Sequence, residues 1–109
     1  MQKEQIQQWT YSLDKENQDL ILIKLTFSEN LEKITEFVII YLTMIDNKPK
    51  EVVKFDGSEK EALHKHKNYE KKKEKLFQNK PINYETIEEI TNYIEKNLRM
   101  LKVSYIENK

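Results

Sequence analysis

Runs of apolar residues predict four β-strands in the first half of the chain. The first run alternates loosely between apolar and polar positions, and the second places Ile21, Ile23 and Leu25 on one face. The third run is apolar at consecutive positions around Ile39, which is typical of a central strand that is covered on both faces. β-branched and aromatic residues are frequent in these runs and favour strands over buried helices. The predicted strands are Ile6–Leu13, Asp19–Phe27, Ile34–Ile45 and Val52–Asp56.

Short polar segments separate the four predicted strands. Residues 46–49, with the sequence DNKP, predict a hairpin between the third and fourth strands. Asp46 and Asn47 tolerate a left-handed backbone, and Pro49 cannot donate a hydrogen bond to a strand ladder. Because strands joined by short turns pair in an antiparallel manner, the first 56 residues predict a four-stranded antiparallel meander.

Near the C-terminus, apolar residues recur at three- and four-residue spacing and predict one long helix, from about Tyr84 to about Tyr105. Asn83 is a suitable N-cap, and Glu85 lies in the first turn, where the helix dipole favours a negative charge. Asn97 allows a second interpretation, in which the helix ends there and residues 101–105 form a final strand. The apolar stripe consists of Ile87, Ile90, Ile94, Leu98, Leu101 and Tyr105.

These elements predict a single α+β domain over residues 1–109. An antiparallel sheet with an apolar face needs a cover, and the C-terminal helix has the apolar stripe to supply it. The expected fold is an antiparallel sheet of four to five strands in a meander, packed against one long C-terminal helix. Lys75–Phe77 is the candidate for a short fifth strand at one edge.

The charge balance limits the classes of function. The chain has 19 basic and 19 acidic residues, so its net charge is zero, which argues against a protein that coats nucleic acid by bulk electrostatics. A local basic patch remains compatible with this balance: residues 64–80 contain seven lysines and two glutamates, a local charge of +5. The abundance of Lys and Glu is typical of a thermophile, and an AT-rich genome produces the same bias.

Rare residue types exclude several kinds of site. The absence of cysteine excludes disulfides, thiolate metal sites and a cysteine nucleophile, and it favours a cytoplasmic protein. With Gly57 as the only glycine, a glycine-rich phosphate loop is excluded. No apolar run has the length of a membrane span, so no membrane association is expected.

Residues 51–67 hold the candidate chemistry of this chain. They contain Gly57 and both histidines, His64 and His66, and they begin with a short apolar strand that ends in Asp56. If residues 64–66 are extended, the two imidazoles share one face of a strand, whereas on a helix they would lie about 200° apart. The sequence therefore predicts one site, on the condition that this tripeptide is part of a strand.

The order of these features resembles the TumE-type toxins of prokaryotic toxin–antitoxin pairs and related small domains of unknown function. The resemblance covers the second half of the chain and is carried by the strand Val52–Asp56, the H-x-H of His64 and His66, and the helix start Glu85–Ile90. Lys54 stands where family members commonly have arginine. The resemblance implies a toxin-like protein that acts on RNA and has a cognate antitoxin as its partner.

A metal-independent ribonuclease without a cofactor is the expected activity. Such an enzyme needs a base for the 2′-hydroxyl, an acid for the leaving oxygen, and cations for the charge on phosphorus. Histidines titrate in the range that suits both proton roles. The expected acid/base pair is His64 and His66, with Asp56 as orienting carboxylate and Lys54 as charge stabiliser. The expected phosphate contacts are Lys65, Lys67, Lys71, Lys72 and Lys73, and Tyr69 is expected to stack on a base.

Other functions fit the same residues. His64 and His66 with Asp56 or a glutamate would form a two-histidine-one-carboxylate metal site. Nucleotidyl transfer onto protein or RNA is a further enzymatic variant. A non-catalytic module that binds a protein or a nucleic acid, or that forms a homodimer, would leave the histidines as incidental solvated side chains. Such a module predicts an uncovered apolar patch on the helix or at the edge of the first strand.

Overall fold

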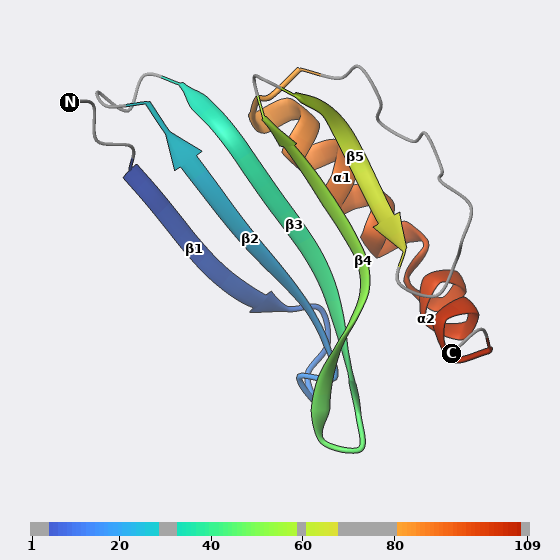
Figure 1. Ribbon diagram of the computed structural model, residues 1–109. Helices are drawn as coiled ribbons and strands as arrows, with labels where there is room; N and C mark the ends of the chain where they lie inside the picture. Colours follow the sequence, from blue (N-terminus) through green and yellow to red (C-terminus); the bar gives the residue numbers. More distant parts are fainter. Residues whose placement is uncertain (1–4, 29–32, 59–60, 68–80, 108–109) are drawn as a thin grey trace.

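The computed structural model describes residues 5–28, 33–58, 61–67 and 81–107. They form an antiparallel sheet whose strands follow one another in chain order, with two helices on one face (Figure 1). The last strand, β5, is described by its backbone and pairing alone. The strands are β1 (Gln5–Ser12), β2 (Asp19–Phe27), β3 (Ile34–Ile45), β4 (Lys48–Ser58) and β5 (Glu61–Lys67), and the helices are α1 (Tyr84–Lys96) and α2 (Leu98–Glu107).

The α+β class and the four-stranded meander of β1 to β4 are confirmed. β2 and β3 have the predicted bounds, and β1 is shifted by one residue towards the N-terminus. The hairpin between β3 and β4 is shorter than predicted, because Asp46 and Asn47 alone form the turn, with φ of 54° and 64°. β4 consequently begins at Lys48 and includes Pro49. At Pro49, β4 pairs with β3 alone, because its pairing with β5 involves only residues from Val53 onwards, and a strand with one partner tolerates proline. The predicted strand at residues 75–77 lies outside the described residues.

The prediction of one long helix is wrong, because α1 ends at Lys96 and Asn97 is its C-cap. The side-chain amide of Asn97 donates to the carbonyl oxygen of Tyr93 over 2.8 Å, and its backbone N–H donates to the same oxygen over 3.0 Å. The alternative was right about the break and wrong about a final strand, since residues 98–107 form α2. The apolar stripe continues through the break because both helices pack on the same face of the sheet. The start of α1 is as predicted: Asn83 Oδ1 accepts a hydrogen bond from the Thr86 N–H over 2.9 Å.

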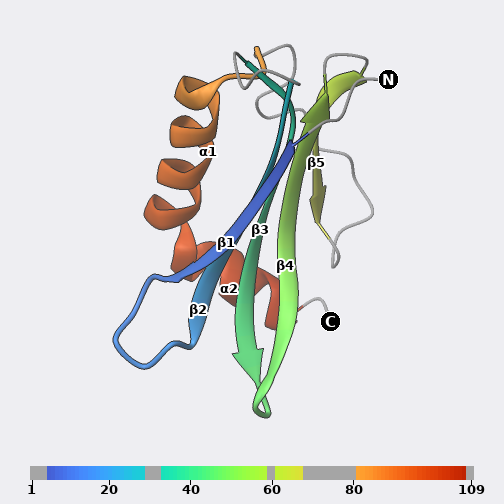
Figure 2. The ribbon, with the colours of Figure 1, turned by 90° about the vertical axis from the view of Figure 1, so that its left-hand side faces the viewer.

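The core lies between the sheet and the two helices. Figure 2 shows α1 standing on one side of the sheet. α1 contacts β3, and α2 contacts β4. The Phe55 ring meets the Tyr93 ring edge-on, with centroids 6.1 Å apart and an interplanar angle of 80°. The buried residues on this side of the sheet include Ile21, Ile23, Leu25, Phe37, Ile39, Tyr41, Val53 and Phe55, and the helices contribute Ile87, Ile90, Ile94 and Leu101.

One carboxylate is buried on the helix side of the sheet. Asp19 Oδ1 accepts hydrogen bonds from the Tyr41 hydroxyl over 2.7 Å and from the Thr43 hydroxyl over 2.9 Å. The Lys102 ammonium of α2 lies 3.6 Å from the same oxygen. Burial, and then the hydrogen bond to Asp19, raise the pKa of Tyr41 well above its ordinary value of 10.0. This Asp19 cluster therefore joins β2, β3 and α2.

In the described ranges, neither helix has the length and the apolar character needed to cross a membrane.

The β1–β2 turn is organised by Asp14. Its carboxylate accepts hydrogen bonds from the backbone N–H groups of Gln18 and Asp19, each over 2.9 Å. The bond from Asp19 is the largest cause that holds the pKa of Asp14 below its ordinary value of 3.8. The turn is thus closed by the ionised form of this side chain.

The contribution of Asp14 to stability is expected to depend on pH. Because the folded pKa of Asp14 is below the unfolded one, its contribution is fully present above pH 3.8 and is lost as the pH falls through the folded pKa. Asp14→Ala should lower the melting temperature at neutral pH, and its difference from the wild type should shrink below pH 3.8. Thermal melts from pH 2 to 7, with Glu16→Ala as the control in the same turn, measure this. A difference that is constant over the whole range would contradict the assignment.

Candidate functional site

β4 alternates between the two faces of the sheet and directs its charged residues away from the helices. Val53, Phe55 and Gly57 are buried, whereas Lys54 and Asp56 are partly exposed on the opposite face, which we call the open face. Their side chains are 36% and 26% exposed, and Lys54 Nζ lies 3.9 Å from Asp56 Oδ2. The apolar residues of β4 thus hold a lysine and an aspartate in a defined position on a rigid strand.

The pairing between β4 and β5 aligns the two histidine positions with these two residues. His64 pairs with Asp56, and His66 pairs with Lys54. Directly opposed residues of an antiparallel pair occupy the same face, with Cβ atoms about 4.5–5.5 Å apart. The register therefore places positions 54, 56, 64 and 66 in a two-by-two arrangement on the open face. We call these four positions the β4–β5 block.

A β-bulge adjoins the block. Between the pairs Asp56–His64 and Ser58–Glu61, β5 has two residues, Ala62 and Leu63, where β4 has one, Gly57. On its other side, Gly57 pairs with the fully buried Phe37 of β3. Bulges bend a strand and change the direction of neighbouring side chains, and they are frequent next to active sites. The only glycine of the chain is thus at the irregular position beside Asp56.

The other residues that the sequence proposed for this site are not all in the block. Lys65 pairs with Phe55 and Lys67 with Val53, so the register places both lysines at positions of the helix side rather than the open face. Tyr69 and the three lysines at 71–73 lie outside the described residues. Of the candidate phosphate contacts, none is therefore aligned with the histidine positions by the described pairing.

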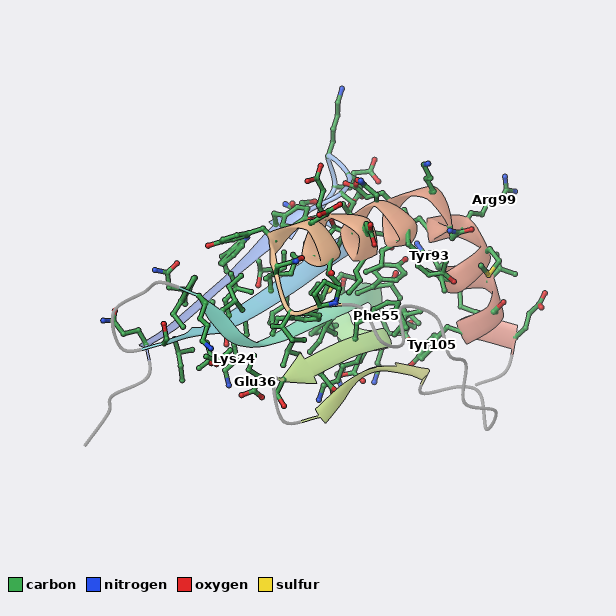
Figure 3. The ribbon with its side chains drawn as sticks, turned by 90° about the horizontal axis from the view of Figure 1, so that it is seen from above. Lys24, Glu36, Phe55, Tyr93, Arg99 and Tyr105 are labelled. Atoms are coloured by element: carbon green, nitrogen blue, oxygen red, sulfur yellow. The ribbon has the colours of Figure 1, made fainter. Side chains whose placement is uncertain are left out.

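Sequence patterns missed Lys24 as a neighbour of the block. Lys24 of β2 pairs with Val38 of β3, which in turn pairs with Asp56. Lys24 is therefore in the same row of the open face as Asp56 and position 64, about 10 Å from Asp56 at the usual strand spacing. Figure 3 shows Lys24 and Glu36 on the side of the sheet opposite the helices, whereas Arg99 points outwards from the helices. Only the strand register, which the sequence does not specify, brings Lys24 to this row.

The residue types at these four positions are ones that can transfer protons and stabilise charge. A carboxylate opposite a histidine orients the imidazole and stabilises its protonated form, as in catalytic triads. A lysine beside the second histidine supplies a positive charge for a phosphate oxygen. In the parts of the chain whose side chains are described, no three histidine, aspartate or glutamate residues gather as a metal site. The alternative metal site depends on His64 and His66 and stays a prediction.

Comparisons with known proteins place the chain in a family but not in a functional class. No curated protein and no solved structure matches the chain. The family match extends over the full length, residues 1–109. The chain belongs to the family described as a domain of unknown function, DUF7718.

Proposed function

We propose that the β4–β5 block is the active site of a metal-independent ribonuclease. The observation that carries this proposal is the β4–β5 register, which pairs His64 with Asp56 and His66 with Lys54. Two groups that titrate near neutral pH, a carboxylate and a cation thereby occupy adjacent positions on one face of the sheet. The reaction requires these groups and no metal or organic cofactor.

The reaction is a transesterification within the RNA backbone. One histidine takes the proton of a 2′-hydroxyl, whose oxygen then forms a bond to the adjacent phosphorus. The bond from phosphorus to the 5′-oxygen breaks, and the second histidine protonates that oxygen. The products are a 2′,3′-cyclic phosphate and a free 5′-hydroxyl. Asp56 orients the imidazole of His64, and Lys54 stabilises the negative charge that develops on the phosphate oxygens.

RNA binding beyond the scissile phosphate falls to lysines around the block. Lys24 supplies a cation in the same row of the open face. Lys65, Lys67, Lys71, Lys72 and Lys73 supply further phosphate contacts from the basic part of the chain, and Tyr69 stacks on a base. Because such contacts release counterions, RNA affinity should fall as the salt concentration rises.

The biological setting of this activity is a toxin–antitoxin pair in the cytoplasm. The support for it is the resemblance of the second half of the chain to TumE-type toxins, in the motif of Val52–Asp56 followed by His64 and His66. In this setting a cognate antitoxin binds the protein and suppresses cleavage.

A non-catalytic binding module is the second candidate function. It is favoured by exposed apolar residues of α2 that follow one another at three-residue spacing, namely Met100, Val103 and Ile106. An uncovered apolar stripe of this kind marks a protein-binding surface more often than an active site. In this case the histidines make no contribution to binding or turnover.

RNA cleavage by the purified protein, with and without EDTA, tests the ribonuclease. His64→Ala and His66→Ala are each expected to lower the cleavage rate by about 10²-fold or more, and EDTA should have no effect. Glu61→Gln is the control on the same strand, opposite Ser58 and outside the block, and it should keep the wild-type rate. Inhibition by EDTA would favour the metal site instead. An inactive wild type, or histidine variants that cleave as fast as the wild type, would favour the binding module.

A further inference from the structure

β1 is an edge strand with an uninterrupted ladder on one side. It pairs with β2 at every residue from Gln5 to Ser12, without a register shift. On its other side, no strand pairs with it in the described part of the chain, and β1 is the outermost strand in Figure 1. The backbone N–H and C=O groups of alternate residues therefore face outwards. All but one of its residues are exposed. β1 therefore has the geometry that accepts another strand.

This edge lacks the features that normally prevent strand pairing. Edge strands are usually protected by lysines or other charges, by proline, by a bulge or by short length. The eight residues of β1, QIQQWTYS, include no charged residue, no proline and no glycine, although 35% of the chain is charged. By contrast, the stretch of β4 that lacks a β5 partner begins with Lys48 and Pro49. The absence of protection at β1 therefore favours a strand partner there.

We propose that two copies of this chain pair through their β1 edges, antiparallel and around a two-fold axis, to form one continuous sheet. Two identical edges meet in such a dimer, so a charged strand would place like charges close together, whereas the uncharged β1 is compatible with itself. The helices make most of their contacts with β3 and β4, and α1 reaches β1 at Tyr11, which interacts with Thr91 and Glu95. Trp9 and Ile6, which are 42% and 59% exposed, would lose part of that exposure.

The two-fold axis restricts the register of this pairing. Opposed residues must share a face, and in the sheet of each copy Trp9 and Tyr11 face the helix side while Gln8 and Thr10 face the open side. Two registers satisfy this condition and pair the largest number of β1 residues between the two copies. In one of them, Trp9 lies opposite Trp9 of the second copy, which buries two indole rings together. In the other, Gln8 lies opposite Gln8, and the two side-chain amides can donate to and accept from each other.

The dimer would place the two β4–β5 blocks at opposite ends of the extended sheet, because β1 and β5 are the two outer strands of each copy. The β1–β1 interface therefore does not include the proposed active sites. The inference does not depend on ribonuclease activity, and its test measures association alone.

Sedimentation velocity of the wild type and of two double variants tests the dimer. Ile6→Glu/Thr10→Glu puts charge on the β1 edge at exposed positions that pair with Thr26 and Leu22, so the monomer fold is kept. The control, Tyr84→Glu/Asn92→Glu, adds the same charge at exposed positions of α1. We expect the wild type and the control to be dimers and the β1 variant to be a monomer. A monomeric wild type, or a β1 variant that still dimerises, would overturn the proposal.

Cross-linking identifies the register independently. Because the chain has no cysteine, one introduced cysteine can form a disulfide only with its counterpart in a second copy. Opposed residues in an antiparallel pair have Cα atoms about 4.5–5.5 Å apart, which a disulfide can span. We expect one of Trp9→Cys and Gln8→Cys to cross-link on oxidation, and Met100→Cys not to do so. Equal cross-linking of all three variants would contradict a β1 interface. If β1 pairs with a strand of another protein and not with a second copy, the proposed dimer is wrong.

Discussion

Phe55→Ala is expected to lower the free energy of unfolding by about 3–5 kcal/mol. Phe55 is fully buried in the middle of β4, pairs with Ile39 of β3, and meets the ring of Tyr93 on α1 edge-on. The substitution removes the burial of a whole ring and leaves a cavity between sheet and helix that neighbouring side chains fill only in part. It also removes the aromatic pair, which is worth about 0.5–1.5 kcal/mol beyond its buried area.

Urea denaturation followed by circular dichroism measures this effect. Tyr84→Ala is the matched control, because it also removes an aromatic ring but from a side chain that is 63% exposed. It should change stability by no more than about 0.5 kcal/mol. Phe55→Leu should recover most of the loss, since it refills much of the cavity. If Phe55→Ala and Tyr84→Ala destabilise the protein equally, Phe55 does not anchor β4 under the helices.

Phe55 also links stability to the proposed active site. It lies between Lys54 and Asp56, and its burial determines which face of β4 these two residues occupy. A variant that loosens β4 is therefore expected to lower both stability and RNA cleavage, whereas a variant of the block should lower cleavage alone.

Asp19→Ala is expected to have the second largest effect, a loss of about 2–4 kcal/mol, because it leaves two buried hydroxyls without their acceptor. The hydroxyls are those of Tyr41 and Thr43, which donate to Asp19 over 2.7 Å and 2.9 Å. Asp19→Asn keeps an oxygen acceptor and should cost less. Lys102→Met removes only the partly exposed ion pair to Asp19 and should cost less than about 1 kcal/mol. If Lys102→Met costs as much as Asp19→Ala, the ion pair rather than the hydroxyls dominates.

The free energy of unfolding at high pH also depends on the Asp19 cluster. The folded pKa of Tyr41 is raised above its unfolded value of 10.0, so its contribution is fully present below pH 10 and declines as the pH rises above it. Tyr41→Phe should remove this part of the alkaline loss, and its stability should therefore fall less steeply than that of the wild type above pH 10. Denaturation curves between pH 8 and pH 11.5 compare the two slopes.

Local patterns in the sequence were sufficient for most of the sheet. β2 and β3 were predicted with their bounds because their apolar residues alternate with the period of a strand and polar turns bound them. The cap of α1 was predicted because Asn83 accepts a hydrogen bond within its own turn. These features depend on residues that are neighbours along the chain, so the sequence contains all of the relevant information.

The sequence could not decide whether the C-terminal helical region is one helix or two helices separated at Asn97. The stripe from Ile87 to Tyr105 keeps its spacing through Asn97, and periodicity alone cannot distinguish one straight helix from two helices that contact one core. The start of β4 was missed for a related reason. Proline is disfavoured in strands, but at Pro49 β4 is locally an edge, and that depends on where β5 begins to pair.

The sequence by itself supplied the residue types on which the proposed chemistry rests, that is, two histidines two positions apart, a lysine–x–aspartate at the end of a strand, and a basic segment after them. Only the tertiary structure decided which of these residues are neighbours. Pairing across β4 and β5 aligns Asp56 with His64 and Lys54 with His66, places Lys65 and Lys67 at positions of the other face, and brings Lys24 into the row. The physical reason is that strand register follows from packing and turn geometry over the whole sheet, and a shift of one residue would move every side chain to the opposite face.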